Sequence, residues 1–148
     1  GDAAAIAAKM AALANQARAK SHRAVMSQAM SPKDATAALT DYWSPRAVGD
    51  VDDSYIKVAK VLGTFGWHSH EDEDEMFLIL SGQLRIEMEA GAVELAEGEM
   101  FVVPRGVRHN PVAAQECCLM LIERKSTLHT GNVVTARTRS LAEQLGSA

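Results

Sequence analysis

The chain has 148 residues, which suits one domain with a sizeable buried core. Hydrophobic residues make up 47% and charged residues 23%, and both values are ordinary for a globular protein. The net charge of −4 gives no reason to expect a nucleic-acid partner, and no apolar run approaches the roughly 20 residues of a membrane-spanning helix.

The two cysteines, Cys117 and Cys118, are neighbours in the sequence. Adjacent side chains of a strand point to opposite faces, so a disulfide between them would be strained. Two free thiols without a secretory hydrophobic segment predict a reducing, cytoplasmic setting.

Residues 1–30 are predicted to form an N-terminal helical extension. This segment is rich in alanine, and its apolar side chains recur every three or four positions, as on one helical stripe: Ile6, Met10, Leu13, Val25 and Met26. The stripe packs either on the rest of its own chain or across a partner subunit, and we favour a homodimer. One alanine-rich helix followed by a short one does not supply a helix-turn-helix, which disfavours DNA binding.

The main domain is predicted over residues 31–135. It begins with a short helix to about Thr40, in which Ser31 is the N-cap and Pro32 lies in the first turn. From Trp43 onward, short apolar segments alternate with glycine and acidic turns, and such a pattern predicts an all-β sandwich or barrel. Strands are predicted at Tyr55–Leu62, Thr64–His70, Met76–Leu80, Leu84–Glu89, Ala92–Leu95, Met100–Val103 and Cys117–Glu123. A tail, residues 136–148, follows, with a short helix at Arg139–Leu145.

Five consecutive carboxylates, from Glu71 to Glu75, precede the strand at Met76–Leu80. Adjacent like charges repel each other, so most of them are expected on a solvated loop. Glu75 is the exception because it begins the apolar strand. Phe77 and Ile79 share its face by the period of two and are expected to form an apolar wall beside it. Trp67 has the opposite parity to His68 and is expected to pack on the outside.

Two segments carry side chains that suit a metal ion. In the first, His68 and His70 lie two positions apart and Glu75 follows. In the second, glycine and proline turns lead to His109. Residues i and i+2 of a strand project to the same face, so the first two histidines can converge on one point. Imidazole binds Zn, Cu, Fe or Ni, and a carboxylate adds a hard oxygen ligand.

These segments resemble the two motifs of the cupin superfamily, in which His-x-His is followed by Glu and Gly, and Gly precedes Pro-x-Gly-x-x-His. The resemblance is to small single-domain cupins. It implies a double-stranded β-helix, which is a jelly-roll barrel, and one divalent metal ion (Fe, Mn, Zn or Ni) bound by His68, His70, Glu75 and His109. Asp74 is the alternative to Glu75, because some cupins use the shorter spacing.

Three functions remain open for such a site. The first is a mononuclear metalloenzyme of the oxygenase, isomerase or lyase type acting on a small polar metabolite. The second is a non-catalytic protein that uses the metal to hold a small-molecule ligand, and in the third the ion is purely structural. Four protein donors leave one or two positions open on an octahedral ion, as in catalytic sites.

An enzyme would need a general acid or base near its substrate, and an anionic substrate would need a cation. The candidate acids and bases are Tyr55, Lys57, Glu87, Cys117 and Cys118. The candidate cations are Lys57, Arg85, Arg105 and Arg108. The sequence does not choose among them, so the catalytic residues stay unassigned.

Overall fold

The computed structural model describes residues 2–25, 28–126 and 144, with side chains described from residue 28 onward and over residues 2–15 of the N-terminal helix. The chain divides into two compact units, Gly1–Met30 and Ser31–Ala148. The helix predicted at Arg139–Leu145 lies outside the described residues, apart from Gln144. The predicted domain boundaries and the homodimer stay predictions.

The predicted N-terminal helix is present as α1, Asp2–Val25. Asp2 lies in its first turn, where a negative charge interacts favourably with the helix dipole and stabilises the helix. Ile6, Met10 and Leu13 are each more than half exposed on this helix. Among the helices of the described residues, none is both long and apolar enough to cross a bilayer.

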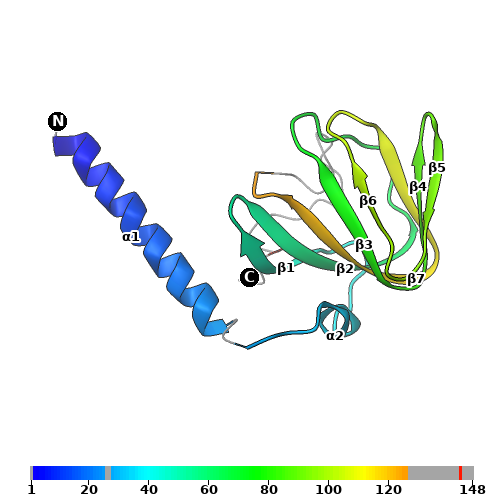
Figure 1. Ribbon diagram of the computed structural model, residues 1–148, viewed down its shortest axis with the longest axis horizontal. Helices are drawn as coiled ribbons and strands as arrows, with labels where there is room; N and C mark the ends of the chain where they lie inside the picture. The colour runs from blue at the N-terminus through cyan, green and yellow to red at the C-terminus, as the bar shows by residue number, and fades with distance from the viewer. Residues whose placement is uncertain (1, 26–27, 127–143, 145–148) are drawn as a thin grey trace. The chain divides into compact units, whose positions relative to one another are not determined.

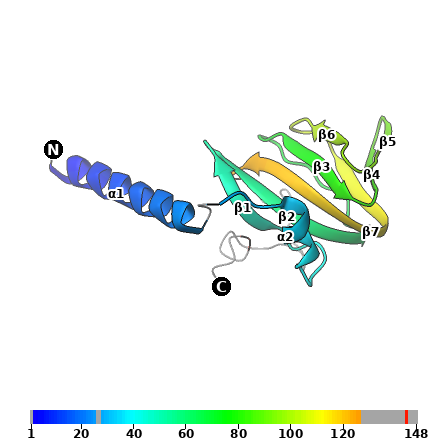
Figure 2. The same cartoon turned by 60° about the horizontal axis from the view of Figure 1, so that its bottom comes forward.

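The second unit opens with α2, Pro32–Ala37. The Ser31 hydroxyl accepts a hydrogen bond from the Asp34 backbone N–H, which confirms the predicted N-cap. The predicted end at about Thr40 is wrong, because the helix ends at Ala37. The Leu39 N–H then donates to the Thr36 carbonyl, three residues earlier, and not to the carbonyl four residues earlier as in an α-helix. α2 packs on the outside of the strands (Figure 2). Its Thr36 side chain is buried.

Seven antiparallel strands form the rest of the described fold (Figure 1). Their bounds are β1 Arg46–Val51, β2 Ser54–Thr64, β3 Glu75–Ser81, β4 Leu84–Met88, β5 Gly91–Leu95, β6 Met100–Val103 and β7 His109–Arg124. The long strand β7 is the centre of the sheet and pairs with β2, β3 and β4. The strand order is β1-β2-β7-β3-β6, and the hairpin of β4 and β5 attaches to β7. The predicted all-β jelly-roll barrel is confirmed.

The strand predicted at Thr64–His70 is wrong. β2 runs on to Thr64, and the chain then leaves the sheet through Gly66, whose φ of +125° suits glycine. His68 makes only an isolated bridge to His109. Two strand segments were also missed, namely β1 and the first half of β7. The first half of β7 was missed because a proline, Pro111, usually ends a strand. In the structure β7 continues through Pro111, which is paired with Ile86 of β4.

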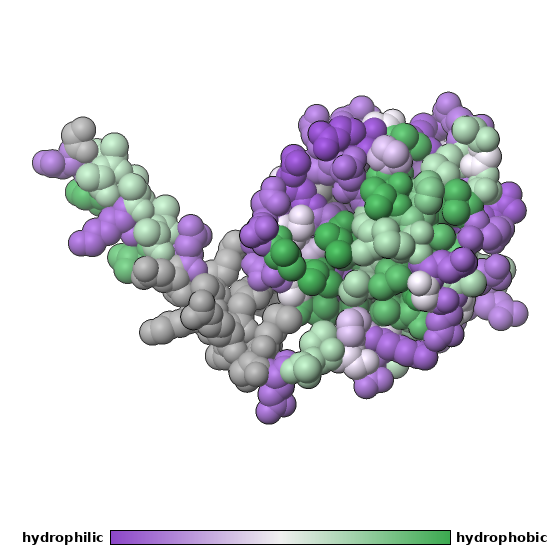
Figure 3. Space-filling model, in the orientation of Figure 1, coloured by the Kyte–Doolittle hydropathy of each residue, from purple (hydrophilic) through white to green (hydrophobic). Residues whose placement is uncertain are grey.

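The barrel interior follows the period-two pattern of the strands. On β3, Glu75, Phe77 and Ile79 are buried, while the intervening Met76 and Leu78 are half-buried on the outer face. The core also takes Val61, Leu84, Ile86, Leu119 and further apolar side chains. On the outer face of the neighbouring strand β6, Met100 and Val102 are exposed, and apolar surface gathers over this part of the barrel (Figure 3).

The β3–β4 hairpin depends on Gly82, and a substitution there should be costly. Gly82 has φ +83°, and an added Cβ would lie 2.8 Å from the Glu116 carbonyl oxygen. Gly98 has nearly the same φ, +82°, but no atom within 4 Å of such a Cβ. Gly98→Ala should therefore cost only about 1–2 kcal/mol for the left-handed backbone. Gly82→Ala should cost about 1–3 kcal/mol more for the overlap. Urea unfolding of both variants measures the difference, and equal losses would contradict the close approach.

Candidate metal centre

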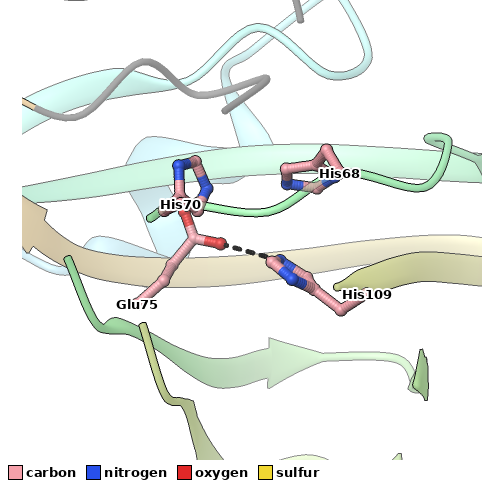
Figure 4. A group of neighbouring side chains, drawn as sticks. All are labelled: His68, His70, Glu75 and His109. Carbon is pink, nitrogen blue, oxygen red and sulfur yellow. Dashed lines mark ion pairs between the residues drawn. The ribbon is translucent and has the colours of Figure 1, made fainter. Parts of the chain in front are cut away.

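Four side chains from three segments of the chain converge inside the barrel (Figure 4). One ligand atom from each of His68, His70, Glu75 and His109 lies within 4.8 Å of the others, and all four residues are buried. Glu75 Oε1 lies 3.4 Å from His109 Nε2, and Glu75 Oε2 lies 3.5 Å from His70 Nε2. Among the described residues this group could hold a metal ion.

The backbone holds the three histidines in place. Glu75 begins β3 and His109 begins β7. The N–H of His68 donates to the His109 carbonyl at 3.0 Å, and the N–H of His109 donates to the His68 carbonyl at 2.8 Å. The Gly106 N–H donates to the His70 carbonyl. The convergence predicted from i and i+2 on a strand is thus reached by another route, a loop fastened to the start of β7.

The rings of His68 and His109 are oriented by carbonyl groups. His68 Nδ1 lies 3.1 Å from the Gly66 carbonyl oxygen, and His109 Nδ1 lies 2.9 Å from that of Val107. A carbonyl oxygen only accepts, so each Nδ1 carries the hydrogen and donates it. In the neutral ring Nε2 then has a lone pair and can serve as a metal ligand.

The donor set fits a cation. His70 Nε2 and His109 Nε2 are buried without a hydrogen-bond partner in the part of the chain that the structure describes. Both face the Glu75 carboxylate across the gaps given above, so these side chains surround a common point at which a cation could bind. Burial, with a smaller contribution from His109, lowers the pKa of His68 to about 4, so this ring is neutral at pH 7. A divalent ion would satisfy all four groups.

A second layer of buried charge lies behind Glu75. Burial acts to raise the pKa of Glu75, but polar contacts with Glu123, His109 and His70 outweigh it and hold that pKa well below the ordinary value. Burial and the charge of Glu75 raise the pKa of Glu123 well above its ordinary value. The two carboxyls are thus coupled, because their contacts favour the charged form of Glu75 and disfavour the charged form of Glu123. Lys57 Nζ donates to Glu123 Oε1 at 2.7 Å and also to Gln144.

A cavity adjoins the four-residue group. His68 and Glu75 line one part of it, and Phe77 and Leu121 lie beside them. The cavity has about 390 Å³ of atom-free space including its mouth, of which the centre of a water molecule can reach about 40 Å³. It is therefore narrow. Phe77 forms the predicted apolar wall, whereas Ile79 belongs to the core and does not line the cavity.

Several candidates from the sequence lie away from the group. Asp74 is on an exposed loop, where it accepts a hydrogen bond from the Arg105 backbone. Arg85 pairs with Glu87 and Glu94. Arg108 stacks on Trp67, which is partly exposed, as its parity predicted.

Of the candidate cations, Lys57 alone is buried inside the barrel. The Cys117 thiol is a poor nucleophile, because burial and the neighbouring Cys118 raise its pKa to about 12. Sequence reasoning missed Glu123 and Gln144. The signal for Glu123 was present, since it has the same parity on β7 as the buried Leu119 and Leu121.

The low pKa of His68 predicts that the metal-free protein loses stability in acid. The ring titrates near 6.5 when unfolded and near 4 when folded. Between these values the unfolded chain binds more protons, so stability falls as pH drops from 6.5 towards 4. At about 1.4 kcal/mol per pH unit this amounts to about 3 kcal/mol. Urea unfolding of the metal-free protein and of His68→Asn from pH 7.5 to 4 should show a shallower slope for the variant, and parallel curves would contradict the assignment.

Comparisons with known proteins agree with this architecture. A family model described as a cupin domain matches residues 56–123. A crystal structure of a cupin-2 domain containing protein from Shewanella frigidimarina is 39% identical, with a TM-score of 0.62 over 64% of this chain and 93% of that one. Protein NMB1881 from Neisseria meningitidis is 32% identical, with a TM-score of 0.60 over 66% of this chain and 99% of that one. The uncharacterized protein YdbB of Bacillus subtilis is 26% identical over 80 residues, which are 53% of this chain and 71% of YdbB. The chain belongs to the cupin family.

Proposed function

We propose that this protein binds one divalent metal ion (Fe, Mn, Zn or Ni) through His68, His70, Glu75 and His109 and acts as a mononuclear metalloenzyme on a small molecule. The observation that carries the proposal is the buried convergence of four donor atoms beside a cavity. Three imidazoles and one carboxylate are a donor set for first-row transition metals. The ion would supply an open coordination position and a positive charge to a molecule in the cavity.

The second layer of charge supports this use of Glu75. Glu123 contacts the Glu75 carboxyl from behind, and Lys57 fixes Glu123 in turn. A carboxylate held by such contacts cannot swing out of the site, so its two oxygens stay directed at His70 and His109.

The cavity lining bears on the type of reaction. Besides His68 and Glu75, the side chains that line it in the described residues offer no carboxyl, amine, thiol or phenol as a general acid or base. Isomerase and lyase chemistry of the acid–base type depends on such groups. This favours a reaction centred on the metal, such as that of an oxygenase when the metal is iron. It equally suits the alternative function, a non-catalytic protein in which the ion holds a ligand.

The first test is elemental analysis of protein purified without a metal-affinity column. One ion per chain is expected, and iron would direct the next step to oxygen uptake with small organic acids and phenols. A protein that contains no metal and takes up none of the four candidate ions would overturn the proposal. Stoichiometric metal without turnover of any compound would select the ligand-holding alternative.

The choice between neighbouring carboxylates gives a sharper test. Glu75→Gln should lower metal affinity by more than 100-fold, because it removes a ligand and not only an outer contact. Asp74→Asn should change the affinity by less than three-fold, since Asp74 bonds to Arg105 on the exposed loop. Competition with a chromogenic chelator measures both. The reverse order of effects would assign the site to Asp74.

A further inference from the structure

The cavity offers a bound molecule almost no hydrogen-bonding partners. Its polar side chains in the described residues are Trp43, His68 and Glu75. The Trp43 indole N–H already donates to the Leu62 carbonyl, and His68 Nδ1 already donates to the Gly66 carbonyl. The remaining lining is apolar, with two prolines and the side chains of Ala59, Val61, Phe65, Phe77, Leu119 and Leu121. Polar recognition is thus confined to the end where His68 and Glu75 lie.

This distribution selects against polyhydroxylated molecules. A hydroxyl group that leaves water for an apolar wall loses its hydrogen bonds, and each such group costs roughly ten-fold or more in affinity. A methylene group in the same place gains roughly four-fold, from the transfer of its surface out of water. Sugars and polyols are therefore poor occupants, and a compact hydrocarbon body is a good one. The narrow cavity keeps that body small.

The charged residues near the cavity limit the net charge that the head group of a bound molecule can carry. Among the described residues no lysine or arginine lines the cavity, and the carboxylates Glu71, Asp72 and Glu73 are on the loop just before Glu75. A second negative charge on the bound molecule would have no cation of the protein to meet. One anionic oxygen group suits a site with three neutral imidazoles, one carboxylate and a divalent ion, because that site keeps one net positive charge.

From this geometry we propose that the natural ligand or substrate is a small monoanion, with one oxygen head group that meets the metal and a compact apolar body that fills the cavity. The inference rests on the proposed metal site. The sequence predicts a small polar metabolite, and this inference restricts that class to molecules with one acidic group on an apolar body, such as carboxylic acids and phenols. It excludes sugars.

The test uses the full chain loaded with Zn²⁺ and a series of straight-chain carboxylates from acetate to hexanoate, measured by calorimetry. Affinity should rise roughly four-fold with each methylene until the cavity is filled, and then level off. Pentanoate and 4-hydroxybutyrate form the decisive pair, since they differ by a terminal methyl against a hydroxyl. Pentanoate should bind at least ten-fold more tightly.

A substitution in the cavity lining tests whether the acids of this series bind in this cavity. Ala59 lines it and is 2% exposed, so Ala59→Leu should end the rise at a shorter acid. Ala92→Leu makes the same change at an exposed position of β5 and should leave the series unchanged. If Ala59→Leu does not fold, Leu121→Ala should extend the rise by at least one methylene.

The outcomes separate this inference from the proposed function. A chain that binds neither Zn²⁺ nor any other of the four candidate ions overturns the metal site itself. Stoichiometric Zn²⁺ with affinities independent of chain length, or with tighter binding of the hydroxy acid, leaves the metal site intact and overturns the ligand class. A folded, metal-loaded Ala59→Leu protein with an unchanged series would place the acids elsewhere and overturn it too.

Discussion

Lys57→Met should lower the free energy of unfolding by about 3–5 kcal/mol, the range for breaking a buried ion pair on one side. Lys57 and Glu123 are 1% and 2% exposed, and Nζ lies 2.7 Å from Glu123 Oε1. Without the lysine, the buried carboxyls of Glu123 and Glu75 remain inside the barrel without the ammonium group that now lies beside Glu123. Methionine retains most of the apolar volume, so a lost charge and not a new cavity accounts for the effect. Urea unfolding of the metal-free protein measures it.

The chain contains a matched control on its surface. Lys125 Nζ lies 2.8 Å from Asp50 Oδ2, but these two side chains are 27% and 30% exposed. The same substitution, Lys125→Met, should cost at most about 1 kcal/mol, because water screens the pair. The double variant Lys57→Met with Glu123→Leu should recover much of the loss, since it removes both members of the buried pair. Equal losses in the two single variants would mean that Lys57 is not desolvated in solution.

Prediction from the sequence succeeded where one local rule decides the outcome. Alternation of apolar and polar residues located β3, β4 and β6 almost to the residue, because one face of each strand is buried. The same rule placed Phe77 on the face of Glu75. Ser31 before Pro32 marked the start of α2 through a single side-chain hydrogen bond. The four histidine and glutamate positions came from motif spacing, and the structure brings those side chains together.

Prediction from the sequence failed where contacts between residues far apart in the sequence determine the structure. The path of residues 65–74 is set by the paired backbone bonds between His68 and His109, which lie far apart in the sequence. The burial of Lys57 depends on Glu123, 66 positions away, and on Gln144, 87 positions away. A lysine on a strand gives no local sign of such partners, so it was grouped with the surface cations Arg85, Arg105 and Arg108. The apolar character of the cavity likewise emerges only when β2, β3 and β7 close around it.

His109→Ala should abolish most metal binding while leaving the β-sheet circular-dichroism signal nearly unchanged. The side chain is fully buried and supplies one of the four converging donor atoms. We expect an affinity loss of more than about 100-fold, beyond the range seen for outer contacts of a metal ligand. The backbone bridge to His68 uses the N–H and carbonyl of residue 109, and alanine keeps both. The fold around the site should therefore survive the loss of the imidazole.

Metal content by elemental analysis and affinity by chelator competition measure the effect, with His22→Ala as a control that removes a histidine outside the group of four. This control should retain one ion per chain. If His109→Ala still bound one ion per chain, the ligand assignment would be overturned, because the other three side chains would then be enough to bind the metal. A loss of metal together with the sheet signal would contradict the backbone argument instead, since it would make the imidazole itself necessary for the fold.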